Sequence, residues 1–322
     1  MRRALLVLLA VLALGCRRRR VEPHAIATPP TPLGDVEIVV LGTAQDGGLP
    51  HVGCHAAPCE RARRDASFRR LVVSLGIVDR RADRRFLVEA TPDLPLQLDR
   101  LDLVAGGARP RGQNSVDGVL LTHAHIGHYT GLVHFGREVS ATRNLPVYAS
   151  ERMLGFLQGA GPWKLLFDFG HASPHILPAD LAVALTDRVR VTAIVVPHRD
   201  ELSDTVAFRI EGPTRKLLFL PDIDRWEKWP RRIEDEVAAV DIALLDATFY
   251  GANEVPGRNA AEIPHPLVTD TLARLGALAK SKRIVLVHLN HSNPIADPAS
   301  PEATVVRASG LEVGQDGMRF AL

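Results

Sequence analysis

Three histidines within six residues are the feature of this sequence with the clearest chemical meaning. His123, His125 and His128 follow the apolar run 119–121 and precede Gly131. Alternate side chains of an extended segment point the same way, and a turn into a helix brings the third imidazole back toward the others. Because the chain has only 13 histidines in 322 residues, the clustering favours a metal site over three ordinary polar loop residues.

Three further residues of metal-binding types follow apolar runs later in the chain. His198 comes after the run 194–197, Asp222 after 218–221 and His288 after 284–287. One such residue is most often an ordinary loop residue, but three behind a histidine triad predict a shared site, because the ends of neighbouring strands meet along one sheet edge. Asp222 is preferred to Asp224 because it lies nearer the end of its strand.

Runs of apolar residues predict short strands in two groups, each interrupted by helices. Helices are expected over 92–103, 150–157 and 267–278, and a loop rich in Gly, His and Pro over 42–59. Without an internal repeat, this pattern favours one α/β (α+β) domain over 34–322, with two sheets and outer helices. The expected strands are 36–41, 71–78, 85–89, 116–121, 145–148, 181–185, 189–196, 205–210, 216–220, 242–245 and 284–287.

The composition excludes a strongly basic protein. The net charge is +2, and six arginines lie in the first twenty residues, so the remainder has no basic excess for nucleic acid. With 46% hydrophobic residues, the chain can bury a large core. We therefore expect a small-molecule substrate and no nucleic-acid partner.

The N-terminus has the form of a secretory signal. Two arginines precede an apolar run over 4–14, and Cys16 follows Gly15 in a pattern that resembles a bacterial lipobox, although Ala13 departs from it. This predicts an exported protein whose lipidated Cys16 anchors it on the periplasmic side of a membrane through a charged, Pro-rich tether over 17–33. The arginines at 17–20 oppose translocation and leave an uncleaved anchor as the alternative.

The order of these ligand types resembles the metallo-β-lactamase fold superfamily, whose signature is His-x-His-x-Asp-His followed by separate His, Asp and His. Three segments are similar to the coenzyme PQQ synthesis protein B branch of this superfamily: 42–48, 90–93 and the loop that contains Cys54 and Cys59, here called the cysteine loop. The resemblance implies an αββα sandwich of two mixed sheets, with helices on the outer faces and metals at one sheet edge. It assigns His123, His125 and His198 to a first metal, Asp222 to a bridge, and His128 and His288 to a second metal. One or two zinc ions are expected, with iron or manganese as alternatives.

One position departs from the signature. Gly127 stands where the superfamily has Asp, so the second metal loses an anionic ligand. We expect that site to be weakened or empty unless a loop carboxylate, Asp46 or Asp93, compensates.

Two segments are candidates to line the pocket. Asp246, at the end of a buried strand, begins a segment similar to the general-acid segment of superfamily phosphodiesterases, which usually carry His there. This predicts a proton donor or a positioning group, with a structural turn as the alternative. His265 adds an imidazole in a Pro-flanked turn. Three tryptophans are interpreted either as a lid over the substrate or as packing residues: Trp163, Trp226 and Trp229.

A second metal-binding pattern lies in the cysteine loop. His51, Cys54 and Cys59 have spacings compatible with a structural zinc site, and relatives of this branch combine such a loop with a distant His, here His291. A disulfide between the two cysteines is the rival interpretation for an exported protein.

The chemistry implied is that of a metal-dependent hydrolase, in which a metal-activated water attacks an ester, phosphodiester or related bond. A mononuclear iron oxygenase or hydroxylase related to PQQ biosynthesis is the first alternative, because one metal with open positions suits oxygen chemistry. A non-catalytic metal-binding lipoprotein is the second, since one fold hosts many functions.

Overall fold

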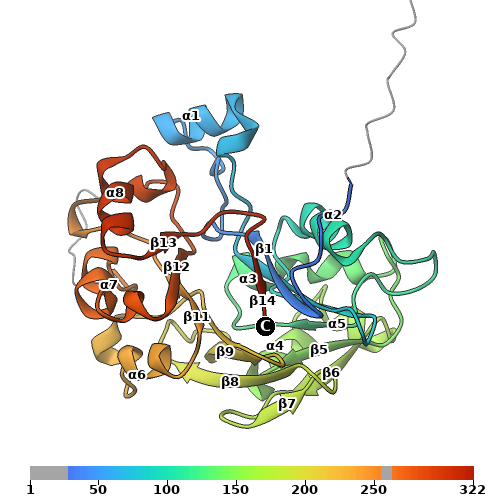
Figure 1. Cartoon of the computed structure of the whole chain (residues 1–322). Coiled ribbons are helices and arrows are strands. Elements are labelled where there is room, and N and C mark those ends of the chain that lie inside the picture. Colours follow the sequence, from blue (N-terminus) through green and yellow to red (C-terminus); the bar gives the residue numbers. More distant parts are fainter. Residues whose placement is uncertain (1–27, 255–262) are drawn as a thin grey trace, which may run out of the picture.

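Two seven-stranded sheets pack face to face and carry helices on their outer faces (Figure 1). The computed structural model describes residues 28–254 and 263–322. Both sheets contain parallel and antiparallel pairs, so the predicted αββα sandwich of mixed sheets is confirmed. The proposed leader with Cys16, and the tether up to residue 27, lie outside the described residues.

The first sheet has the order β14-β1-β2-β3-β4-β5-β6. β1 pairs antiparallel with β14 and β2, and β2 with β3, whereas β3 to β6 run parallel. Its strands are β1 (Val36–Gly42), β2 (Ser74–Asp79), β3 (Arg84–Val88), β4 (Gly118–Leu120), β5 (Leu145–Ala149), β6 (Ala172–Ile176) and β14 (Arg319–Ala321).

The second sheet repeats this plan with the order β13-β12-β11-β10-β9-β8-β7. β7 to β10 alternate in direction, and β10 to β13 run parallel. Its strands are β7 (Ala182–Ala184), β8 (Arg190–Val196), β9 (Thr205–Glu211), β10 (Lys216–Leu220), β11 (Ile242–Asp246), β12 (Arg283–Val287) and β13 (Glu312–Val313).

The longer helices flank the two sheets. Figure 1 shows α6, α7 and α8 on one side of the strands and α2 on the other, with α1 projecting away from both sheets. The α-helices are α1 (Ala57–Arg64), α2 (Leu94–Ala105), α3 (Ile126–Tyr129), α4 (Glu151–Gly159), α5 (Lys164–Asp168), α6 (Ile233–Ala238), α7 (Val268–Leu275) and α8 (Pro301–Ala308). None of the helices in the described ranges has the length and hydropathy needed to cross a bilayer.

Successive side chains along a strand contribute to different layers of the core. In β10, Leu217 and Phe219 belong to the core between the sheets, whereas Leu218 and Leu220 belong to the core under α6, α7 and α8. β1 behaves in a similar way, since Ile38 faces the other sheet whereas Val39 and Leu41 pack beneath α2. Successive side chains of a strand point to opposite faces, so a strand covered on both faces is apolar throughout.

Several predicted elements need correction. The loop expected over 42–59 ends earlier, because α1 begins at Ala57 and Pro58, in its first turn, favours the start of a helix. The sequence analysis did not predict β6, because this exposed edge strand contains Pro and His and lacks an apolar run. It also did not predict α8, although Ser300 caps this helix by accepting a hydrogen bond from the amide of Ala303.

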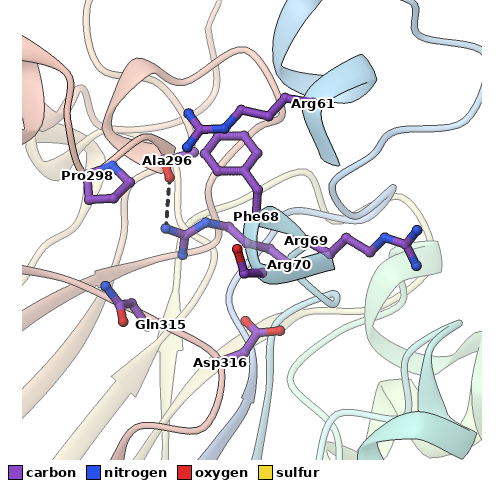
Figure 2. A pocket seen from close by; sticks show the side chains of 9 residues that line it. Arg61, Phe68, Arg69, Arg70, Ala296, Pro298, Gln315 and Asp316 are labelled. Carbon is purple, nitrogen blue, oxygen red and sulfur yellow. Dashed lines mark hydrogen bonds between the residues drawn. The ribbon is translucent and has the colours of Figure 1, made fainter. Parts of the chain in front are cut away.

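A buried arginine ties the loop after β1 to the C-terminal part of the chain. Figure 2 shows Arg70 in a polar pocket, with a hydrogen bond to the carbonyl of Ala296. Its Nη1 also donates to Thr43 Oγ1 at 3.1 Å and to the carbonyl of Gly314 at 2.5 Å. Asp316 accepts from Thr43 Oγ1 and from the amide of Leu71. The guanidinium of Arg70 thus connects three segments of the chain, at Thr43, Ala296 and Gly314.

We expect Arg70→Leu to lower the free energy of unfolding by about 3 kcal/mol, because it leaves buried carbonyls without donors. Arg81, whose side chain is 72% exposed in an ion pair with Asp35, provides the control, and Arg81→Leu should cost less than about 0.5 kcal/mol. Urea unfolding with a constant m-value measures both. Equal losses for the two variants would contradict this role of Arg70.

Candidate metal centre

The sheet topology brings the predicted ligands to one edge. β3 to β6 are parallel, and β8, β10, β11 and β12 all point the same way in the second sheet. His123 follows β4 of the first sheet, whereas His198 and Asp222 follow β8 and β10 of the second. The carboxyl ends of these strands therefore hold the candidate ligands, as is common for ligand sites in α/β proteins.

One carboxylate lies at the centre of the cluster. Asp222 is 3% exposed, and its Oδ2 lies 3.1 to 4.0 Å from ring nitrogens of five histidines: His198, His123, His125, His288 and His128. Asp224 is directed elsewhere, because its Oδ2 pairs with Lys228 at 2.6 Å. The structure thus brings together all six residues that the sequence assigns to metal binding.

The first group consists of His123, His125, His198 and Asp222, whose ligand atoms all lie within 4.8 Å of one another. His198 Nε2 is 3.2 Å from His125 Nδ1 and 3.1 Å from Asp222 Oδ2. In a tetrahedral zinc site with bonds of about 2.0–2.1 Å, ligand atoms lie about 3.3–3.4 Å apart. The contacts of His198 with His125 and with Asp222, at 3.2 and 3.1 Å, are close to that spacing.

The polar atoms that face the cluster centre fit a metal better than they fit one another. The Nε2 atoms of His123, His128 and His288, which lie 3.3 to 4.0 Å from Asp222 Oδ2, are buried without a hydrogen-bond partner among the described residues. Burying an unpaired polar atom is costly. Several such atoms that converge on one point are suited to bind a metal cation. The donor set of imidazoles and carboxylates is the one that zinc prefers.

Outer groups orient the imidazoles. Thr122 Oγ1 lies 2.9 Å from His123 Nδ1, and Glu201 Oε2 lies 3.2 Å from His125 Nε2. Thr248 Oγ1 lies 2.8 Å from His288 Nδ1. Each contact directs the opposite ring nitrogen toward Asp222, which is how outer partners fix the ligand atom of a metal-binding histidine.

The second group contains His128 and His288 around the same Asp222 oxygen. His128 Nδ1 lies 3.4 Å from Oε1 of the fully buried Glu89. Burial opposes the charged imidazole, but Glu89 and the other carboxylates outweigh it and raise the pKa of His128 to about 9. Glu89 and His288 both have positive φ, at 70° and 61°, and strained backbone of this kind is concentrated at functional sites.

Asp46 takes the place that Gly127 leaves open. Its Oδ1 accepts a hydrogen bond of 3.1 Å from the amide of Gly127 and lies 3.7 Å from His128 Nε2. A Cβ atom on Gly127 would lie 2.1 Å from that oxygen, so no larger residue fits. Asp46, His128 and His288 form a group able to hold a metal ion. Asp93, the other carboxylate considered, instead accepts from the amide of Val72.

Asp246 and His265 lie together on the opposite side of Asp222. His265 Nδ1 is 2.9 Å from Asp246 Oδ2 and 3.2 Å from Asp222 Oδ1. Burial opposes its charge, but the two carboxylates raise the pKa of His265 to about 10. Asp246 also accepts hydrogen bonds from Thr248 and from the amide of Ile223, and these contacts suit a carboxylate. Of the two predicted roles, the contacts of Asp246 favour positioning.

The cysteine loop forms a separate group. Cys54, Cys59 and His291 have ligand atoms within 4.8 Å of one another. Both cysteines are free thiols, so the disulfide interpretation does not describe this structure. The ring of His51, the fourth residue of the predicted site, lies 4.4 Å from the ring of His291 but is not part of the three-residue group.

The tryptophans do not form a lid. Trp226 and Trp229 are 4% and 5% exposed in the core under the helices of the second sheet, and their indole nitrogens donate to Thr271 and to the carbonyl of Val195. Trp163 packs against the ring of Tyr129 at 4.8 Å. The lid interpretation is wrong for Trp226 and Trp229, because their large apolar surface is more stable buried.

Comparison with known proteins agrees with this geometry. A family model described as Beta-lactamase superfamily domain matches residues 84–289. The chain belongs to this superfamily. It is 29% identical over 310 residues to the coenzyme PQQ synthesis protein B of Cupriavidus necator, and the match covers 88% of the chain and 99% of that protein. The resemblance inferred from the sequence is confirmed.

Solved structures show the same fold. The Zn²⁺-bound PqqB from Methylobacterium extorquens superposes with a TM-score of 0.75 at 23% identity, covering 89% of this chain and 100% of that one. A diphosphatase from the PhnP family has a TM-score of 0.64 at 20% identity and covers 88% of this chain and 96% of that one. This β-lactamase superfamily member therefore keeps the complete fold that carries a metal in the zinc-bound structure.

Sequence analysis missed the outer groups. Glu89, Thr122, Glu201 and Thr248 contact the rings of the cluster, yet none was singled out. Thr122 and Glu89 lie at strand ends, where a polar residue directly after an apolar run is the available signal. Glu201 lies in an ordinary charged loop and offers no such signal.

We expect Asp46→Ala to weaken binding of a second metal ion at least about tenfold while the first ion still binds, because the second group loses its separate carboxylate. Gly127→Ala should do the same by displacing Asp46. Titration of metal-free protein with Co²⁺, followed by absorption and by metal analysis, measures both. Asp93→Ala is the control, and two ions bound tightly by the Asp46 variant would refute this assignment.

We expect Cys54→Ser to lower the zinc content by about one ion per chain, because the cysteine group loses a thiolate. His55→Ala provides the control, since His55 lies in the same loop and its side chain is 81% exposed. Metal analysis of the two purified variants gives the answer. Unchanged zinc, together with a chain mass lower by two hydrogens before reduction, would show a disulfide instead.

Proposed function

We propose that this β-lactamase superfamily member is a metal-dependent hydrolase that cleaves an ester or phosphoester bond. The observation that carries the proposal is the convergence of His123, His125, His198 and Asp222 at 3.1 to 3.8 Å beside an open cleft. A bound divalent ion supplies a Lewis acid there and lowers the pKa of a coordinated water. Zinc is the ion that this donor set favours.

The residues around the metal groups divide the remaining tasks. His128, His288 and Asp46 would hold a second ion, with Asp222 shared between the two groups. Glu201 and Thr122 keep the rings of His125 and His123 directed inward. Rigid outer contacts of this kind preorganise the site before substrate arrives.

A proton for the leaving group is available at His265. Burial opposes the charged ring, but Asp246 and Asp222 raise the pKa of His265 to about 10, and Asp246 fixes the ring through the 2.9 Å contact to Nδ1. We assign Asp246 to positioning and His265 to holding the proton. Of the two roles considered for Asp246, we favour positioning over general acid, because each of its oxygens accepts a hydrogen bond from a backbone amide.

The geometry favours hydrolysis over the oxygenase alternative. The oxygenase alternative depended on a single metal with open coordination positions. That arrangement was expected because Gly127 removes a carboxylate ligand from the second metal site. Asp46 restores a carboxylate at this point, and two adjacent metal groups suit a clamp on the attacking and leaving oxygens. The diphosphatase of similar fold supports the hydrolytic class.

We expect metal-replete protein to hydrolyse p-nitrophenyl acetate or bis(p-nitrophenyl) phosphate, and His123→Ala to lower the rate about a thousandfold or more. His175→Ala, at an exposed histidine outside the cluster, should keep the wild-type rate. Equal rates for wild type and His123→Ala would overturn the proposal. Oxygen uptake by iron-loaded protein without any hydrolysis would favour the oxygenase.

A further inference from the structure

A cleft opens directly beside the metal groups. It has a volume of about 300 Å³ and is lined by residues from the loop after β1, from α3 and from the loop after β8. Asp46 and His125, two of the candidate ligands, belong to its wall. The polar pocket of Figure 2 shares none of its nine lining residues with the metal groups. The cleft is therefore the place where a reacting bond can reach the metal groups.

One wall of the cleft is apolar and exposed. Ile126 is 62% exposed and Leu202 is 49% exposed, although both lie beside polar ligand residues. Tyr129 forms the base of this wall and is supported by the rings of Phe156 and Trp163 at 5.4 and 4.8 Å. Exposed apolar side chains at the edge of a site gain stability when an apolar ligand group covers them.

Arg199 supplies a positive charge on the same cleft. It is exposed and forms no ion pair within the part of the chain that the structure describes. Of the two carboxylates of the cleft, Asp46 accepts a hydrogen bond from the amide of Gly127, whereas Glu201 contacts His125 and also interacts electrostatically with Arg199. The guanidinium makes no side-chain hydrogen bond among the described residues, so its donors can bind an anion, and their planar arrangement matches the oxygens of a phosphate group.

We propose that the cleft selects a phosphodiester that carries an apolar ester group. This inference rests on the proposed function and specifies its substrate class. The single charge of the diester matches the single guanidinium of Arg199, and its apolar group covers Ile126 and Leu202. A neutral carboxylic ester gains nothing from Arg199.

The reaction balances with water as the only co-substrate. A bond forms between the water oxygen and phosphorus, and the bond from phosphorus to the leaving oxygen breaks. One proton of the water is released to the site, and the leaving oxygen takes up one proton, for which His265 is the assigned source. The products are a phosphomonoester and an alcohol.

The first test compares Arg199→Gln with Arg215→Gln, which removes the same charge from the exposed turn between β9 and β10 at the far end of the sheet. We expect Arg199→Gln to raise KM for bis(p-nitrophenyl) phosphate about tenfold, and to lower the preference for this substrate over p-nitrophenyl acetate by the same factor. Arg215→Gln should keep the wild-type preference. Equal preferences in both variants would overturn the role of Arg199.

The second test concerns the apolar wall. Ile126→Ser should reduce the preference for bis(p-nitrophenyl) phosphate over methyl p-nitrophenyl phosphate about fivefold, because an exposed apolar contact is lost. Ile176→Ser, at an isoleucine that is 55% exposed outside the cleft, is the matched control. An unchanged preference in the Ile126 variant would contradict the apolar subsite.

A binding measurement separates this inference from the proposed function. Calorimetry with diphenyl phosphate, a diester that is cleaved slowly, should give a Kd about tenfold higher for Arg199→Gln than for wild type. Equal affinities would overturn the inference even if the enzyme hydrolyses esters. Weaker binding by the variant, with no hydrolysis of any substrate by wild type, would support the ligand class and overturn the proposed function.

Discussion

The buried carboxylate of Asp222 is the interaction on which the site depends. It is 3% exposed, and its two oxygens lie within 4.0 Å of ring nitrogens from six histidines. Three of these histidines come from the first sheet and two follow strands of the second. A buried charge is stable only when groups of opposite charge or a metal surround it. The cluster therefore joins the edges of both sheets around one negative charge.

Buried carboxylates act on two histidines at the edge of the cluster. Glu89 lies beside His128, and Asp246 lies beside His265, and both imidazoles have raised pKa values. Protons and metal ions compete for such nitrogens, so a metal ion held by His128 would have to displace the proton that Glu89 favours there. Glu89 and His288 keep strained backbone to maintain this arrangement.

The positions of Gly127 and Asp46 show that a prediction from one signature position can be incomplete. The signature position holds no side chain, which by itself predicts a weakened second site. In the fold, the loop after β1 crosses α3 so closely that Asp46 Oδ1 occupies the space of a Cβ on Gly127. A carboxylate from another segment of the chain lies beside His128 instead, and only the packing of the two segments shows it.

The sequence by itself determined the ligand types, their order and the strands that carry them, because apolar runs that end in His or Asp leave a clear local pattern. It also determined the αββα fold through its resemblance to the superfamily. The tertiary structure decided which loop carboxylate faces His128, that both oxygens of Asp246 accept hydrogen bonds from backbone amides, and that Trp226 and Trp229 are core residues. These features depend on contacts between residues far apart in the chain, and such contacts leave no periodic or local signal in the sequence.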